Sequence, residues 1–212
     1  MSNAEFWNRT AAKYAKSQIR DLESYEYTLG RTRSYLKQTD SVLELGCGTG
    51  MTAVKLADAA GRYTATDVAS AMVEIGRARA AEAGAKNLGF AVSGLPDAAL
   101  PEGPFDAVLA FNLLHLVPET DAALAQVYDR LKPGGLFISK TVCLADGLTP
   151  LFIRAILLVM PVMQALKRWP FVHKFTIAGW EERILSAGFE IIETGNFPAR
   201  PPSRYIVARK PG

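Results

Sequence analysis

Three glycines at alternate positions follow a short apolar strand pattern. The strand pattern covers residues 42–45, Gly46, Gly48 and Gly50 come next, and a helical pattern spans residues 52–59. Because glycine has no side chain, such a loop can turn tightly and let a ligand approach the backbone closely. The first N–H groups of the following helix favour an anionic group, either a carboxylate or a phosphate. The segment therefore predicts a binding loop.

An acidic residue follows the next strand pattern. Asp67 comes directly after the strand pattern of residues 63–66, at 67 − 46 = 21 residues past the first glycine. In a doubly wound sheet, this spacing places the carboxylate beside the glycine loop, where it can accept both hydroxyls of a ribose. A carboxylate at the end of an apolar strand is costly to bury without a partner, which favours a ligand-binding role. The two features together predict a nucleoside site.

The spacing of the glycines separates two classes of cofactor. Dinucleotide-binding loops follow G-x-G-x-x-G, whereas Met51 stands here at the position of the third required glycine. An NAD(P)-dependent oxidoreductase is therefore the alternative that the loop disfavours but does not exclude. A protein that binds its cofactor without catalysing a reaction is a second alternative.

The sequence E-L-G-C-G-T-G of residues 44–50 resembles the first motif of class I S-adenosylmethionine-dependent methyltransferases. Further segments similar to the later motifs of that family follow in the same order, namely Thr66 to Ala69 with Met72, Leu95-Pro96, Phe105 to Val108, Asn112 to Val117 and Leu131 to Gly135. Residues 6–8 and 13–15 resemble the N-terminal helix of its ubiquinone/menaquinone-biosynthesis-like branch. The resemblance implies transfer of the methyl group of S-adenosylmethionine to a small, apolar acceptor by direct displacement, with S-adenosylhomocysteine as product.

The resemblance also implies which residues bind the cofactor. The loop would surround the methionine part, and Asp67 would hold the ribose. Val68, Met72 and residues 93–95 would contact the adenine, and the backbone at Asn112 would meet the amino group. A serine stands at position 93, where the family often has an acidic residue that binds the adenine amine. The full predicted set is Tyr14, Glu44, Gly46, Cys47, Gly48, Gly50, Asp67, Val68, Met72, Ser93, Gly94, Leu95 and Asn112. For Glu44, a bond to the loop backbone is an equally good interpretation, and Met72 could instead be a core residue.

Methyl transfer from a sulfonium mainly requires alignment of the acceptor and exclusion of water. A general base would help if the acceptor is a hydroxyl or a carbon acid, and three residues are weak candidates: His115, Tyr14 and His173. His115 comes just after the fourth strand pattern, although it could also merely support its loop. No metal ligand set is predicted, because Cys47 and Cys143 lie far apart without Cys/His spacing.

Strand and helix patterns alternate over most of the chain. Strands are expected at residues 42–45, 63–66, 88–92, 105–110, 136–140, 189–193 and 205–209, and helices at 52–59, 71–83, 122–131 and 178–187. The pattern predicts an α/β fold with a doubly wound, mostly parallel sheet. Pro133-Gly134-Gly135 should end the third of these helices, and residues 195–202 should join the last two strands as an antiparallel pair. The family resemblance implies seven strands in a Rossmann-like sheet.

The composition fits one structural domain. The chain has 212 residues, of which 49% are hydrophobic and 21% charged, and its net charge of +3 does not indicate nucleic-acid binding. We expect an N-terminal helical preface over the cofactor site at residues 1–38 and a methyltransferase domain at 39–212. The polar N-terminus lacks the apolar core of a secretion signal, so a cytoplasmic location is expected.

Residues 151–166 are apolar except for Arg154, Pro161 and Gln164. A transmembrane helix needs about 20 apolar residues, so no membrane span is expected. We favour a lid over the acceptor site, within an insertion at about 147–175, over a packed helix or a subunit interface. Its wall would consist of Phe152, Met160, Met163, Trp169 and Phe171. A peripheral membrane contact through this surface with Lys167 and Arg168 is a further possibility, and no oligomeric state is predicted.

Overall fold

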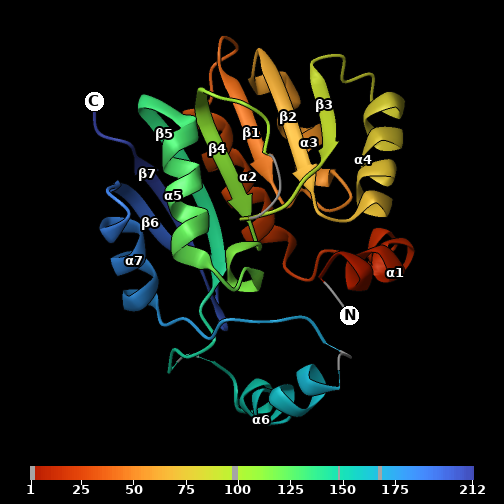
Figure 1. Cartoon of the computed structure of the whole chain (residues 1–212), viewed down its shortest axis with the longest axis vertical. Coiled ribbons are helices and arrows are strands. Elements are labelled where there is room, and N and C mark those ends of the chain that lie inside the picture. The colour runs from red at the N-terminus through yellow and green to blue at the C-terminus, as the bar shows by residue number, and fades with distance from the viewer. Residues whose placement is uncertain (1–2, 97–99, 148, 167–168) are drawn as a thin grey trace.

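The protein is built around a seven-stranded sheet (Figure 1). The computed structural model describes residues 3–96, 100–147, 149–166 and 169–212. The strand order is β3-β2-β1-β4-β5-β7-β6, in which β1 to β5 are parallel and β7 runs antiparallel to both of its neighbours. The strands are β1 Ser41–Leu45, β2 Arg62–Asp67, β3 Leu88–Val92, β4 Phe105–Phe111, β5 Leu131–Val142, β6 Glu190–Ala199 and β7 Pro202–Arg209. The predicted fold class is confirmed.

Helices cover both faces of the sheet because its central strands are apolar on both sides. On one face, α2 (Leu22–Tyr35) and α3 (Met51–Leu56) pack over strand residues such as Val42. On the other face, α5 (Thr120–Arg130) and α7 (Ile177–Ser186) pack over residues such as Leu43. Burial on both faces is the usual environment of parallel strands.

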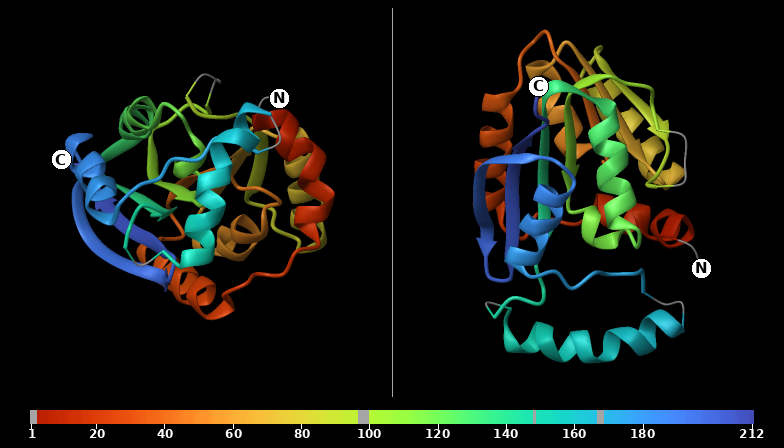
Figure 2. Two further views of the ribbon diagram at one scale, coloured as in Figure 1. Left: turned by 90° about the horizontal axis from the view of Figure 1, so that it is seen from below. Right: turned by 60° about the vertical axis from the view of Figure 1, so that its left-hand side comes forward.

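The N-terminal helix α1 (Asn3–Ala15) packs on α4 (Ser70–Glu82), near the β3 edge of the sheet (Figure 2). Ala11 lies in a small cluster with Ala69 and Met72. The side-chain carbonyl of Asn8 accepts a hydrogen bond from the backbone N–H of Ala71, at 2.9 Å. These contacts hold α1 beside the carboxyl ends of the first strands.

Two predicted boundaries were wrong. Helix α5 ends at Arg130, and residues 131–135 already belong to β5, with Gly134 donating to the carbonyl of Lys210 at 2.9 Å. The connection between β6 and β7 is reduced to Arg200 and Pro201, because β6 continues to Ala199. Both differences arise where pairing with a distant strand overrides proline and glycine as local breakers.

Helix α6 (Leu151–Ala165) lies beyond the carboxyl ends of the parallel strands, apart from the helices that cover the sheet (Figures 1 and 2). Leu157 and Met160 are buried, whereas Leu151, Leu158 and Val162 are exposed. Within the described residues, no helix has both the length and the apolar character needed to cross a bilayer.

Candidate functional site

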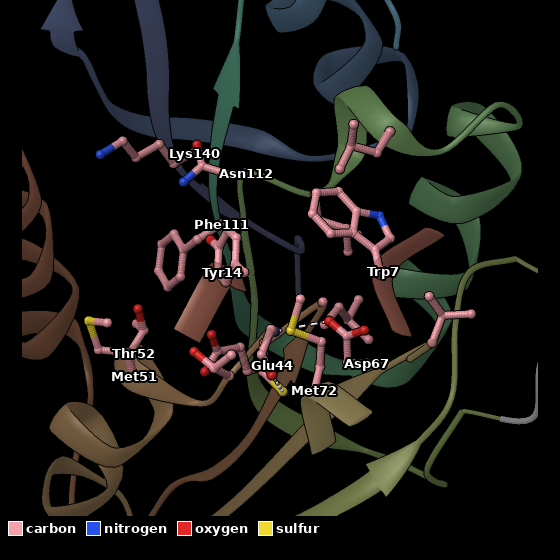
Figure 3. Close-up of a pocket in the computed structure, with 18 of the residues that line it drawn as sticks. Trp7, Tyr14, Glu44, Met51, Thr52, Asp67, Met72, Phe111, Asn112 and Lys140 are labelled. Carbon is pink, nitrogen blue, oxygen red and sulfur yellow. Dashed lines mark hydrogen bonds between the residues drawn. The ribbon is translucent and has the colours of Figure 1, made fainter. Parts of the chain in front are cut away.

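A cavity of about 750 Å³ lies at the carboxyl ends of the central strands. Its wall includes the loop after β1, the ends of β2, β4 and β5, and residues of the N-terminal segment. Figure 3 shows Glu44 and Asp67 on one side of this space and Asn112 and Lys140 on another. Ligand pockets of proteins commonly have volumes of about 300–1,000 Å³, so the cavity can take a small organic molecule.

The glycine loop between β1 and α3 has a backbone that other residues would strain. Gly46, Gly48 and Gly50 all have positive φ angles, of 63°, 53° and 72°. A Cβ atom on Gly46 would lie 2.6 Å from a methyl carbon of Leu113, and one on Gly50 would lie 2.9 Å from the ring of Phe90. Gly46 and Gly48 line the cavity, as Cys47 does, whereas Gly50 is absent from its lining and allows close packing instead.

Asp67 joins the end of β2 to this loop. One carboxylate oxygen accepts the backbone N–H of Gly48, and the other accepts that of Ala69, both at 2.9 Å. The side chain is buried and lines the cavity, and burial raises the pKa of its carboxyl group. Since each carboxylate oxygen has a second lone pair, both oxygens can still accept a ligand hydroxyl. The structure thus brings the predicted carboxylate and the predicted loop into direct contact.

Glu44 is buried beneath the loop, and its recorded side-chain hydrogen bond among the described residues is with Tyr63 rather than with the loop backbone. The hydroxyl of Tyr63 donates to its carboxylate at 2.7 Å. Burial, together with the nearby charge of Asp67, raises the pKa of Glu44 to about 7, although the hydrogen bond from Tyr63 acts in the opposite direction. Glu44 also lines the cavity. Its carboxyl group is therefore positioned to be protonated or ionised near neutral pH.

The predicted adenine-side residues gather on one part of the wall. Val68, Met72, Ser93, Gly94 and Leu95 all line the cavity. Met72 is also buried in the cluster of α1 and α4, so it is a core residue that borders the cavity, and its contact with adenine stays a prediction.

Asn112 occupies the turn after β4 in a left-handed conformation, with φ 55°. Its backbone N–H donates to the carbonyl of Lys140 at 2.7 Å, so only its carbonyl and side chain are available to a ligand.

The three candidate bases lie in different places. Tyr14 lines the cavity, whereas His115 and His173 do not. The backbone N–H of His173 donates to the carbonyl of His115 at 2.6 Å, and its ring nitrogen bonds the carbonyl of Pro118 at 2.9 Å. Burial lowers the pKa of His115 to about 4, and its Nδ1 has no hydrogen-bond partner among the described residues. The arrangement ties two loops together outside the cavity.

Helix α6 contributes nothing to the cavity wall in the described structure. None of the five residues expected to form an apolar wall, Phe152, Met160, Met163, Trp169 and Phe171, lines the cavity. Met160 is instead buried, and Phe152 is 67% exposed. The lid remains a prediction that requires movement of α6 from this position.

Sequence similarity identifies the domain. A methyltransferase domain profile matches residues 42–135. The chain is 35% identical over 100 residues to the ubiquinone biosynthesis O-methyltransferase of Xanthomonas axonopodis pv. citri, covering 46% of this chain and 41% of that protein. It is 36% identical over 101 residues to the ubiquinone/menaquinone biosynthesis C-methyltransferase UbiE of Methylobacterium nodulans, covering 46% and 40%. Residues 42–135 therefore form a methyltransferase domain similar to those of the class I S-adenosylmethionine-dependent methyltransferases. The resemblance to the quinone-biosynthesis-like branch is also confirmed.

Solved structures agree with this methyltransferase fold over nearly the whole chain. The magnesium protoporphyrin IX methyltransferase of Synechocystis PCC 6803, solved with bound S-adenosylhomocysteine, superposes with a TM-score of 0.73 at 18% identity, covering 98% of this chain and 97% of that one. A [4+2]-cyclase, SpnF, superposes at 0.72 and 20% identity, covering 92% and 84%. Because these two proteins have different activities, the fold alone does not determine the reaction.

The family assignment favours neither the oxidoreductase nor the non-catalytic alternative. S-adenosylmethionine is the cofactor of class I methyltransferases, and the curated relatives are named as methyltransferases. The alignments cover only about two fifths of those relatives' lengths, 41% and 40%. The methyltransferase profile ends at residue 135, before the carboxyl end of β5 and before α6. The profile therefore covers β1 to β4 and the loop after β1, but neither α1 nor the carboxyl end of β5, which also line the cavity.

Several cavity residues were missing from the sequence prediction. Trp7, Tyr25, Phe111 and Lys140 line the cavity together with the predicted residues. The same rule that found Asp67 could have found Lys140, since it ends the apolar pattern of residues 136–140. The aromatic residues gave no comparable signal, because apolar side chains in helices and strands usually belong to the core.

Proposed function

We propose that this methyltransferase transfers the methyl group of S-adenosylmethionine to a small, apolar acceptor. The main support is the contact of Asp67 with the backbone of Gly48 at the edge of a cavity of about 750 Å³. The contact fixes a carboxylate beside a loop whose glycines leave room for a ligand against the backbone. The names of the quinone-biosynthesis relatives favour an acceptor with an apolar body.

The residues of the cavity fit the cofactor in three parts. Asp67 would accept the ribose hydroxyls through its remaining lone pairs, and Gly46 to Gly48 would surround the methionine part. Val68, Met72 and Leu95 would enclose the adenine, whose edge would meet Ser93 and Gly94. Glu44, which lines the cavity beneath the loop, would contact the cofactor from that side. Cys47 is expected to pack rather than react, because burial raises the pKa of its thiol.

The sulfonium of the cofactor activates the methyl group, so the chain's own residues mainly position the acceptor and exclude water. Phe111 and Trp7 offer apolar surface for this purpose, and Tyr14 carries a hydroxyl into the same space (Figure 3). Tyr14 is the candidate base that the geometry favours, since the two histidines lie outside the cavity lining. Burial raises the pKa of Tyr14, so its hydroxyl would act as a neutral hydrogen-bonding group.

We further propose that α6 closes over the acceptor. Its outward residues are apolar, with Leu158 81% exposed and Leu151 79% exposed. Burial of exposed apolar side chains is favourable, so covering an apolar ligand beyond the strand ends would stabilise the closed position of the helix. The division into an N-terminal preface, a methyltransferase domain and an insertion at about 147–175 rests on the same proposal.

Calorimetric titration with S-adenosylhomocysteine and with NADH tests the proposed cofactor. We expect binding of the first ligand only. Asp67→Ala should weaken S-adenosylhomocysteine binding by about 10- to 100-fold, because hydrogen bonds to a charged group are lost. Asp58→Ala is the matched control, since Asp58 is exposed and pairs with Arg33 away from the cavity. Binding of NADH instead, or equal affinity in the Asp67 variant, would contradict the proposal.

A further inference from the structure

Lys140 places a buried positive charge on the wall of the cavity. It lies near the carboxyl end of β5, and only 8% of the residue is exposed. Its neighbours in the sheet are Phe111 on β4 and Tyr205 on β7. Paired residues of adjacent strands project to the same face of a sheet, so the lysine lies among aromatic side chains. Figure 3 shows it beside Asn112, across the cavity from Asp67.

The ammonium group of Lys140 has no ion pair among the described residues. Asp21 is close enough to attract it electrostatically, but the pair is not among the salt bridges of 4.0 Å or less. The carboxylate of Asp21 already accepts the backbone N–H of Ser24 at 2.9 Å as the N-cap of α2. Burial lowers the pKa of Lys140. A buried ammonium is costly unless a partner offsets the loss of water, and a ligand in the cavity can supply that partner.

The position of Lys140 assigns this partner to the acceptor. The predicted cofactor contacts, from Gly46 to Asp67 and on to Ser93, follow the ends of β1, β2 and β3. Lys140 lies on β5, with β4 between it and the loop after β1. Of the charged side chains that line the cavity, Arg20 and Asp21 are on the N-terminal segment, while Glu44 and Asp67 belong to the cofactor side.

We propose that Lys140 binds an anionic oxygen of the methyl acceptor, which would be an apolar molecule with an acidic hydroxyl, such as a phenol or an enol. This inference rests on the proposed methyltransferase function and narrows its substrate class. The surrounding Phe111 and Trp7 fit the apolar body of such a molecule. A neutral alcohol or amine would leave the ammonium without an anionic partner.

The charge balance of the reaction agrees with this role. The acceptor hydroxyl loses its proton to solvent on binding, and the lysine ammonium stabilises the resulting oxyanion. An electron pair of that anion, on oxygen or on a conjugated carbon, forms the new bond to the methyl carbon. The electron pair of the broken sulfur–carbon bond stays on sulfur and neutralises its positive charge. Lys140 remains protonated throughout and transfers no proton.

A nitrophenol probe can test this without turnover. 4-Nitrophenol changes its absorption when it ionises, whereas its methyl ether, 4-nitroanisole, has the same aromatic body and cannot ionise. Both are titrated into the full-length protein, with and without S-adenosylhomocysteine, across a range of pH. Lys140→Met removes the charge at similar length. Lys132→Met is the matched control, because Lys132 lies near the other end of β5 and pairs with Asp106.

We expect the wild-type protein to bind the phenolate and to lower the pKa of the bound probe. Lys140→Met should weaken phenolate binding by about 10- to 100-fold, the range for a charge-assisted hydrogen bond, and leave 4-nitroanisole affinity unchanged. Equal phenolate affinity in the Lys140 and Lys132 variants, an equal loss for the ether, or no phenolate binding by the wild type would overturn the inference. Failure of S-adenosylhomocysteine to bind would instead reject the proposed function, while the phenolate titration without it still decides the role of Lys140.

Discussion

Glu44 is predicted to make the stability of the protein depend on pH. The residue is only 2% exposed, and the hydroxyl of Tyr63 donates to its carboxylate at 2.7 Å. Burial raises its pKa from 4.5 to about 7. Glu44→Gln keeps the size of the side chain and an oxygen that can accept from Tyr63, but it removes the ionisation. Comparison of the two proteins therefore isolates the cost of a buried charge.

The sign follows from proton binding in the two states. Between pH 4.5 and about 7, the unfolded chain releases the Glu44 proton while the folded protein keeps it. The free energy of unfolding therefore falls as the pH rises through this window. A change of one pKa unit corresponds to about 1.4 kcal/mol, so the rise from 4.5 to about 7 corresponds to about 3 kcal/mol. Wild-type protein should lose about this much relative to Glu44→Gln between about pH 4 and about pH 8.

Urea denaturation of both proteins at several pH values measures this difference. The free energies of unfolding of the two proteins can differ by a constant amount at every pH, because the amide can have less favourable hydrogen bonds than the protonated acid. Only the pH-dependent part reports the ionisation of Glu44, since other groups titrate in both proteins. Glu74→Gln, an exposed change on α4, should show no such pH-dependent difference. If the offset between wild type and Glu44→Gln stays constant across the window, Glu44 is not ionising at a cost and the reasoning is refuted.

Two other predictions concern the lid and the loop. Leu158→Gln should weaken 4-nitroanisole binding by about 10-fold and leave S-adenosylhomocysteine binding unchanged, because the exposed leucine would be buried only over an acceptor. Titration of both ligands measures these affinities, and the same substitution at the exposed Leu185 on α7 is the control. Equal losses of affinity for both ligands in the Leu158 variant would argue against a lid. Gly46→Ala should lower the free energy of unfolding by about 2–3 kcal/mol, since its φ is 63° and its Cβ would lie 2.6 Å from Leu113. Gly84→Ala, with φ 66° and open space around the added carbon, isolates the backbone cost in the same urea assay, and equal losses for the two variants would disprove the steric part.

The order of strands and helices could be predicted because local patterns of apolar and polar residues determine it. The strand around Val42 alternates between two apolar faces, and a parallel sheet buries both of them. The glycine loop could also be predicted from sequence, because the backbone has positive φ angles at Gly46 and Gly48, which favour glycine. Asp67 was found because a carboxylate at the end of an apolar strand needs a partner. Its bond to the loop backbone then confirmed the expected neighbourhood.

The two wrong boundaries depended on backbone pairing that the local residue types do not indicate. Residues 198–202 contain three prolines, which locally favour a loop, yet Ala199 pairs with Pro202 in the hairpin. Strand β6 is at the edge of the sheet, where proline is tolerated because a missing N–H need not break a ladder on both sides. Similarly, Gly134 is held in place by Lys210 rather than by its own helix. The partner of Gly134 lies far outside a local window of sequence, whereas the pairing of Ala199 with Pro202 is local but contrary to the preference of prolines for a loop.

The two halves of the cavity differ in how far a sequence can define them. On the cofactor side, the geometry comes from backbone turns and strand ends, which leave glycine and acidic residues at fixed spacings. On the acceptor side, Trp7, Phe111 and Lys140 come from α1, β4 and β5, and no spacing relates them. The methyltransferase profile covers residues 42–135, so it includes Phe111 but neither Trp7 nor Lys140. On the proposed roles, acceptor choice depends partly on residues beyond the shared motifs, and Lys140, buried among aromatic side chains, is the residue there that is expected to discriminate by charge.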